Sequence, residues 1–583
     1  MAERAMPDKS RPEIGIHARP VPAQGLAGDT TDVPPLLQRI YASRGVRHTN
    51  DLRLTLDALA TPATLPDCSN AAHRLADAVM AGERILIVGD FDADGATSVA
   101  LAISVLRAFG TDNVSFLVPN RFEFGYGLSP EIVELALIQS PAVIVTVDNG
   151  VSSTAGVALA NEHGVDVIIT DHHLPADELP EALAIVNPNL AGSQFPSKAM
   201  AGVGVIYYVM SATRAELRQR GWFATRPSVN LADWLDLVAL GTVADVVALD
   251  HNNRILVYQG LRRIRAGRCR PGFKALCAIA GRSLQRIDAQ DLGFAVGPRL
   301  NAAGRLDDMA IGIRCLLADD AATATEIATA LDELNQMRRV LEQEMVSDAE
   351  LIVAGRDEAD HDQFGVCVYD PSWHQGIVGI VAGRLREKLH RPVIAFADAG
   401  DAAPDELKGS ARSVPQLHIR DVLDAIAARY PGMLVKFGGH AMAAGMSIKR
   451  VHFERFTRAF NTAVEQVLPV DALSPVLLTD GSLLAEERTL AVARRLAAAG
   501  PWGQQFPEPS FYDEFELVNQ RVVGEQHLKL VLKKDDRLFD AIAFRQPSLG
   551  DIKRVAVVYK LQENDYRDAF TLQLMVEHLT ALA

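Results

Sequence analysis

Acidic and imidazole side chains follow three apolar runs of this chain, at the point where each run ends. They are Asp90, Asp92 and Asp94 after residues 85–88, Asp148 after residues 143–147, and Asp171, His172 and His173 after residues 165–170. Short runs rich in valine and isoleucine are typical of buried parallel strands. Because the ligand crevice of an open α/β sheet lies outside the carboxyl ends of its strands, we expect these side chains to converge on one site.

A convergent set of carboxylates predicts a metal centre. Four or more carboxylates in a cleft of low dielectric repel one another strongly unless cations neutralise them. Oxygen ligands with one or two imidazoles suit Mn²⁺ or Mg²⁺ better than a structural zinc, which favours cysteine. A carboxylate that bridges two such ions, about 3.5–4 Å apart, forms a site for in-line attack on a phosphoester.

The number of acidic strand ends carries this prediction, because each one alone is ambiguous. A single aspartate after a strand is about as often a turn residue or the N-cap of the next helix. Three strand ends with the same chemistry favour a site. Asp245 adds a fourth acid after the apolar segment 237–244, which we expect to be helical.

These segments resemble, in order, motifs one to four of the DHH phosphoesterases. The matching stretches are Asp92-Ala93-Asp94-Gly95, Val147-Asp148-Asn149-Gly150, Asp171-His172-His173 and Gly241-Thr242-Val243-Ala244-Asp245. Four later stretches, 297–305, 373–379, 409–413 and 437–440, resemble the branch of that family that degrades single-stranded DNA. The resemblance extends from about Tyr41 to the C-terminus. It implies a 5′→3′ exonuclease specific for single strands, which acts in recombination and mismatch repair.

Composition fits an intracellular enzyme. The chain has 583 residues, enough for three or four domains. No apolar run reaches the length of a membrane span and no apolar signal core follows the N-terminus, so we expect a cytoplasmic protein. Its five scattered cysteines lack metal-ligand spacing and should be reduced. The net charge of −15 favours a narrow positive channel for one strand over broad coating of duplex DNA.

The pattern of the chain predicts an α/β protein with several domains. Residues 1–35 are expected to form a mobile tail, 36–320 a catalytic domain with a parallel sheet, and 321–353 a long connector helix. A smaller α/β domain should follow at 354–470. Residues 471–583 turn to two-residue periodicity with basic positions on one face, which fits an OB-fold-like β-barrel or simply a solvated sheet face. The resemblance implies a DHHA1 domain at 354–470 and an OB-fold after it.

Spacing and resemblance together suggest roles for the acidic cluster. Asp148 is the best candidate to bridge two ions. The other expected ligands are Asp92, Asp94, His172 and Asp245. Asp90, Asp171 and His173 are either ligands, groups that orient ligands, or phosphate contacts, and their roles stay open. The catalytic set is therefore Asp148, Asp171, His172 and His173. A histidine that many relatives carry just before the first acids is absent here, where Val88 and Gly89 stand, so one ion is expected to be held less fully.

Substrate contacts come from the resemblance. It implies that Arg121, Ser410 and Arg412 form a pocket for the 5′-phosphate, which suits the bidentate fork of guanidinium. It also makes candidates for phosphate contact of Arg299, Asn301, Arg305, His374, Gly438, Gly439 and His440. Phe122, Phe124 and Tyr126 are either base-stacking residues or buried aromatics, and buried aromatics are the more common outcome.

Two other functions stay open at this level. One is a DHH phosphodiesterase of short oligonucleotides or cyclic dinucleotides, for which the C-terminal β domain would be superfluous. The other is a non-catalytic scaffold that binds single strands, against which the intact acids argue. The resemblance implies single-stranded DNA with a 5′ end as substrate, and single-strand-binding protein and a RecQ-type helicase as partners. We expect a monomer that does not bind membranes.

Overall fold

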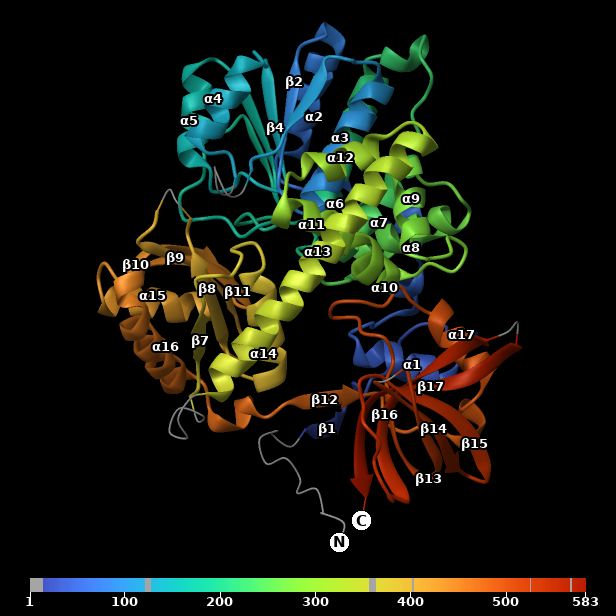
Figure 1. Cartoon of the computed structure of the whole chain (residues 1–583). Helices are drawn as coiled ribbons and strands as arrows, with labels where there is room; N and C mark the ends of the chain where they lie inside the picture. Colours follow the sequence, from blue (N-terminus) through green and yellow to red (C-terminus); the bar gives the residue numbers. More distant parts are fainter. Residues whose placement is uncertain are drawn as a thin grey trace. The chain divides into compact units, whose positions relative to one another are not determined.

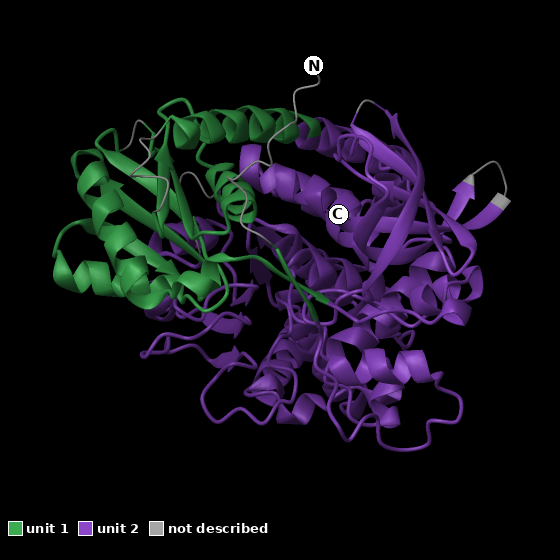
Figure 2. Ribbon diagram, turned by 90° about the horizontal axis from the view of Figure 1, so that it is seen from below, with its two compact units in different colours: residues 1–17, 336–478 green, residues 18–335, 479–583 purple. Residues whose placement is uncertain are grey.

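The computed structural model describes residues 14–120, 127–355, 363–400, 403–524, 526–566 and 569–582. The chain divides into two compact units. One comprises residues 18–335 with 479–583, and the other comprises residues 1–17 with 336–478 (purple and green in Figure 2). Figure 1 labels the elements of both units.

The first α/β domain is built on a five-stranded parallel sheet with the order β3-β2-β4-β5-β6. Its strands are β2 (Ile85–Gly89), β3 (Val114–Leu117), β4 (Val143–Val147), β5 (Asp166–Thr170) and β6 (Ala184–Val186). After β3 the chain returns to the other side of β2, so the strand order reverses between β2 and β4. A reversal of this kind opens a crevice at the carboxyl ends of the two strands.

Both faces of this sheet are covered. Alternate side chains of β2 and β4 enter two different cores: Ile85 and Val145 pack with α2, α3 and α6, while Leu86 and Ile144 pack with α4 and α5. The helices concerned are α2 (Cys68–Ala81), α3 (Ala93–Phe109), α4 (Pro130–Ile138), α5 (Thr154–Glu162) and α6 (Gly202–Gln219). This is the doubly wound arrangement that the alternation of strands and helices predicted.

Further helices complete the first domain. They are α1 (Pro35–Ser43), α7 (Leu235–Ala244), α8 (His251–Arg265), α9 (Pro271–Ile279), α10 (Ala289–Asp291), a π-helical turn (Leu292–Val296), α11 (Gly297–Leu306) and α12 (Ala310–Leu317), with short 3₁₀ turns at 49–52, 56–58, 62–64, 222–224 and 231–234. The connector predicted for 321–353 is α13 (Ala321–Ala354), which runs from one unit into the other.

The second α/β domain has a mixed sheet with the order β10-β11-β9-β8-β7. Only β7 and β8 pair in parallel. The strands are β7 (Val366–Tyr369), β8 (Val393–Asp398), β9 (Glu406–Arg412), β10 (Leu434–Gly439) and β11 (Ala443–Lys449). The helices are α14 (Val378–Leu389), α15 (Ile419–Arg429) and α16 (Phe453–Val467), with 3₁₀ turns at 450–452 and 470–473.

The C-terminal region is a closed barrel with the order β13-β14-β15-β17-β16. Its strands are β13 (Phe511–Val523), β14 (His527–Lys534), β15 (Arg537–Ala543), β16 (Arg554–Tyr566) and β17 (Ala569–Leu582), preceded by a 3₁₀ turn at 485–487 and by α17 (Leu490–Ala498). A five-stranded barrel is the architecture of an OB-fold, as the sequence predicted. The barrel shares a hydrophobic core with the first domain, where Tyr41 stacks on Trp502 and Phe506.

Two smaller observations complete the fold. Within the predicted tail 1–35, described from residue 14 onward, β1 (Gly15–Ala18) pairs with β12 (Val476–Thr479) in a two-stranded sheet. In the part of the chain that the structure describes, none of the helices combines the length and apolar character needed to span a membrane.

Candidate metal centre

Three aspartates meet at the reversal of strand order. Asp90 and Asp92 follow β2, and Asp148 follows β4. Carboxylate oxygens of all three lie within 4.8 Å of one another, a spacing that suits a metal ion. Asp148 takes a left-handed backbone conformation with φ of 64°, which is uncommon for residues other than glycine and often marks a functional site.

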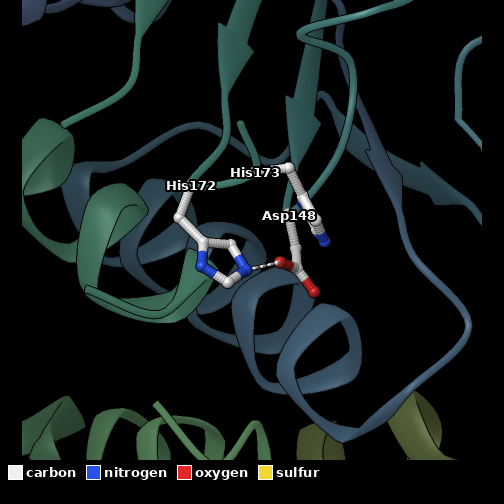
Figure 3. A group of neighbouring side chains, drawn as sticks. All are labelled: Asp148, His172 and His173. Atoms are coloured by element: carbon white, nitrogen blue, oxygen red, sulfur yellow. Dashed lines mark ion pairs between the residues drawn. The ribbon is translucent and has the colours of Figure 1, made fainter. Parts of the chain in front are cut away.

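His172 brings a second group of ligands to the same place. Its Nε2 lies 3.0 Å from Asp148 Oδ1 and 3.5 Å from Asp245 Oδ2 (Figure 3 shows the pair with Asp148). Asp94, in the first turn of α3, completes a group with His172 and Asp245, again within 4.8 Å. Asp245 is the C-cap of α7, so the predicted helix before it is present. The predicted ligands thus converge.

Asp171 and His173 form a supporting pair. Asp171 Oδ1 accepts hydrogen bonds from the backbone amides of His172 and His173, and it lies 2.7 Å from His173 Nδ1. Its Oδ2 accepts from the amide of Val151. Burial alone would raise the pKa of Asp171, but the hydrogen bond and charge of His173 lower it. These contacts let Asp171 hold the ring of His173 and the backbone of both histidines. His172 and His173 form a third group of potential ligands with Asp148 (Figure 3).

Two glycines let neighbouring helices approach the acids closely. A Cβ at Gly202 would lie 2.6 Å from Asp148 Oδ1, and a Cβ at Gly241 would lie 2.7 Å from Asp94 Oδ1. Asp94 also accepts hydrogen bonds from the amides of Gly202 and Val203, at 2.6 and 2.9 Å. Glycine fits both positions because a side chain there would collide with the carboxylate of a candidate ligand.

The cluster carries an excess of buried negative charge. Burial and the neighbouring charge of Asp92 raise the pKa of Asp94 to about 7. Burial and the charges of nearby aspartates also raise the pKa of Asp148 and of Asp245 well above the ordinary value. Groups that resist ionisation in this way become favourable ligands once a cation offsets the repulsion. Carboxylates with one or two imidazoles suit a divalent ion that prefers oxygen.

Three predicted substrate contacts lie on α11, and at least two of them are bonded to other groups of the protein. Arg299 is buried, forms an ion pair with Asp332 at 2.7 Å and donates to Ala295 O. Asn301 Oδ1 accepts from the amide of Ala93 at 2.8 Å, which fixes the first acidic motif. Arg305 is half-buried in the last turn of the helix. The predicted substrate contacts Arg121, Phe122, Phe124 and Tyr126 lie outside the described residues.

The remaining predicted substrate residues belong to the second α/β domain. On β9, Arg412 Nη1 donates to Ser410 Oγ at 3.0 Å. A Cβ at Gly379 would come within 3.0 Å of both of these side chains, so α14 covers them closely. Gly438 and Gly439 end β10, and the His440 amide donates to Ala443 O in the turn to β11. His374, before α14, accepts from the amide of Gly376 at its Nδ1.

Several residues of the site escaped the sequence prediction. Asn187 and Asn189 follow β6 and donate to the carbonyl oxygens of His173 and His172. The signal was available, because they are polar residues at a fourth strand end. Gly202 also escaped the prediction, because its contact with Asp148 depends on long-range packing that no local pattern indicates.

Family models match most of the chain in three parts. They are the DHH family N-terminal domain at residues 84–242, the DHHA1 domain at 362–467 and the RecJ OB domain at 479–578. All the candidate metal ligands except Asp245 lie in the first part, and Asp245 follows its end by three residues. These matches confirm the predicted order of a parallel-sheet domain, a DHHA1 domain and a barrel.

Relatives agree over almost the whole length. The single-stranded-DNA-specific exonuclease RecJ of Salmonella typhimurium is 51% identical over 94% of this chain and 96% of its own. The crystal structure of Thermus thermophilus RecJ in complex with Mn²⁺ matches with a TM-score of 0.83 and 29% identity, covering 99% of this chain and 80% of that one. Its complex with Mg²⁺ matches with a TM-score of 0.76, 27% identity, and 98% and 79% coverage. The chain therefore belongs to the RecJ family of single-stranded-DNA-specific exonucleases.

Proposed function

We propose that this protein removes nucleotides from the 5′ end of single-stranded DNA with a centre of two divalent ions, Mn²⁺ or Mg²⁺. The observation that carries the proposal is the buried cluster of aspartates and histidines at the reversal of strand order. Its charge is suited to cations, and the solved relatives named above are complexes with Mn²⁺ and Mg²⁺. A barrel after the DHHA1 domain favours a polymeric strand over a dinucleotide as substrate.

In this proposal Asp148 would be shared between the two ions, because it groups with Asp90 and Asp92 on one side and with His172 on the other. Asp90 and Asp92 would hold one ion, and Asp94, His172 and Asp245 would hold the other. When bound, the ions lower the pKa of water and stabilise the negative charge that develops on the phosphodiester oxygens. The protein supplies the fixed geometry: the amides of Gly202 and Val203 anchor Asp94, and Asp171 orients the histidines.

Polarity requires recognition of a free 5′ end. We assign this role to Ser410 and Arg412, with Arg121 as a third member. The hydrogen bond between Ser410 and Arg412 holds the guanidinium beside a hydroxyl, a pairing suited to phosphate oxygens. Arg305, His374, Gly438, Gly439 and His440 stay candidates for phosphates near the scissile bond. Arg299, paired with Asp332, is better suited to positioning α11.

The cellular setting is also proposed. Family resemblance suggests a cytoplasmic monomer that acts in recombination and mismatch repair, supplied with single strands by a RecQ-type helicase and bound to single-strand-binding protein.

The test is hydrolysis of a 5′-phosphorylated single-stranded oligonucleotide labelled at its 3′ end, with Mn²⁺, Mg²⁺ or EDTA. We expect mononucleotides to leave progressively from the 5′ end, and EDTA to stop the reaction. Asp148→Asn should be inactive while folding normally, because asparagine tolerates the left-handed backbone at this position.

The matched control is Asp112→Asn, which changes an exposed aspartate in the loop before β3, at the opposite end of the strands. It should keep full activity. Binding without cleavage in either metal would favour the scaffold, cleavage of only the shortest oligonucleotides would favour the small-substrate branch, and release from the 3′ end would refute the proposed polarity.

A further inference from the structure

An aromatic side chain stands exposed on a rare type of helix in the first domain. Phe294 lies in the middle of the π-helical turn Leu292–Val296, and 78% of its surface is exposed. Single π-helical turns inside longer helices are uncommon and occur frequently at functional sites. Its neighbours Leu292 and Val296 are fully buried, so the turn is anchored on both sides of the exposed ring.

The π-helical turn is seated against the end of α7. A Cβ at Gly293 would lie 3.3 Å from Val243 Cγ1, and a Cβ at Gly297 would lie 3.2 Å from Ala244 Cβ. Side chains at these glycines would push the turn away from α7. Asp245, the candidate metal ligand, directly follows Ala244. The turn that carries Phe294 is therefore seated against the end of α7 that leads into the candidate ligand Asp245.

A second exposed apolar side chain lies on the same end of α7. Val246 follows Asp245, is 62% exposed and has a φ of 59°. A β-branched residue rarely takes this left-handed conformation, and such strain is concentrated at functional sites. Two apolar side chains thus remain exposed on segments that adjoin a centre otherwise lined by acids.

We propose that Phe294 is a stacking platform for one base of the single-stranded substrate, with Val246 flanking the same nucleotide; this role rests on the proposed exonuclease function. The occupant follows from continuity with the metal centre, because a strand whose phosphodiester lies at the ions must place its bases beside them. Stacking on an aromatic ring is tolerant of sequence, as a general exonuclease requires.

The first test compares Phe294→Ala, Phe294→Leu and Phe294→Tyr in steady-state hydrolysis of a 5′-phosphorylated oligonucleotide. Loss of one base–aromatic stack should raise KM by roughly five- to 100-fold in Phe294→Ala. Tyrosine should preserve KM and leucine should not, since leucine keeps the apolar surface but cannot stack. Ile138→Ala is the matched control, because Ile138 is also 78% exposed but lies at the end of α4 remote from the strand ends. Thermal denaturation checks that each variant is folded.

The second test identifies the base. We use oligonucleotides that each carry one abasic nucleotide at a different position from the 5′ end. At one position, removing the base should raise the KM of the wild type by the same factor as Phe294→Ala does on the intact oligonucleotide. The same abasic substrate should cause no further rise in the KM of Phe294→Ala. The proposal is overturned if Phe294→Ala leaves KM unchanged, if leucine restores it, or if the variant's defect persists on every abasic substrate.

Binding separates this proposal from the proposed function. Fluorescence anisotropy with Mn²⁺, in proteins that also carry Asp148→Asn, reports the affinity for the same oligonucleotides without hydrolysis. A wild-type protein that binds these oligonucleotides but cleaves none of them would refute the exonuclease. A loss of affinity on adding Phe294→Ala, which disappears at one abasic position, would still support the platform. Equal affinity with and without Phe294→Ala for every oligonucleotide would refute the platform even if the wild-type enzyme is active.

Discussion

The acidic cluster at the strand ends and the C-terminal barrel both bury charged groups, but acids are in excess in the cluster, whereas the buried acid of the barrel is matched by cations. Arg488 is 2% exposed and pairs with Asp513 at 3.1 Å and with Asp535 at 2.8 Å. Tyr559 donates to Asp513 at 2.7 Å, and Lys534 lies 3.0 Å from the same aspartate. Positive and negative groups therefore meet within the protein itself.

The strand ends of the first domain show the opposite arrangement. Asp90, Asp94 and Asp148 are each at most 5% exposed, and His172 is the group that links Asp148 to Asp245. Burial and mutual repulsion raise the pKa values there. We infer that charged groups paired with each other inside the protein have a structural role. An excess of buried groups of one charge instead indicates a ligand of the opposite charge.

The largest expected effect comes from removing one acid of the cluster. Asp94→Asn should lower exonuclease activity by roughly 100- to 1000-fold or more, because charge stabilisation at the reacting phosphate is lost. The metal-free variant should be at least as stable as wild type, since repulsion is relieved. Activity assays and thermal denaturation in EDTA check both. A variant that loses activity only because it unfolds would contradict this expectation.

Removing a buried charge from the barrel should instead lower stability and leave the activity of the metal centre unchanged. Arg488→Met removes the most deeply buried cation that pairs with Asp513 and should lower the free energy of unfolding by about 3–5 kcal/mol. Urea denaturation measures the loss. At temperatures where the variant is still folded, cleavage of very short oligonucleotides should match wild type. Unchanged stability would show that the barrel pair is not structurally important.

A smaller effect is expected from the supporting pair. Asp171→Asn keeps the shape of the side chain but weakens its hold on His173, so activity or metal affinity should fall by about 10- to 100-fold. Titration of activity with Mn²⁺ distinguishes the two, because excess metal should partly restore the variant. A loss as complete as that of Asp94→Asn would instead make Asp171 a direct ligand.

The smallest effect is the pH dependence of stability without metal. The pKa of Asp94 is about 7 in the folded protein against 3.8 ordinarily, so between these values the folded state binds more protons than the unfolded state. The free energy of unfolding should therefore decrease as the pH rises from about 4 to about 7. Urea denaturation in EDTA at pH 5 and pH 8 measures the difference. Asp94→Asn should reduce the decrease, and an equal slope in both proteins would contradict it.

Local sequence patterns predicted which aspartates lie at the strand ends. Long-range packing determines which residues contact their carboxylates. Apolar runs ending in Asp90, Asp148 and Asp171 indicated strand ends, and parallel strands necessarily bring such ends to one edge. No local pattern indicated that Gly202 and Gly241 would pack onto the carboxylates of Asp148 and Asp94, because these contacts join residues about 50 to 150 positions apart. The π-helical turn at Phe294 and the pairing of β1 with β12 also depend on tertiary context.

The most direct test of whether the excess of buried acids binds cations is an anomalous difference map from crystals of this protein soaked in Mn²⁺. We predict two peaks within the cluster, both in contact with Asp148, and we expect the other ligands of the two ions to be Asp90, Asp92, Asp94, His172 and Asp245. Crystals of Asp148→Asn should lose at least one of the two peaks. Strong peaks elsewhere in the molecule with none at the cluster would contradict a two-ion centre at these residues.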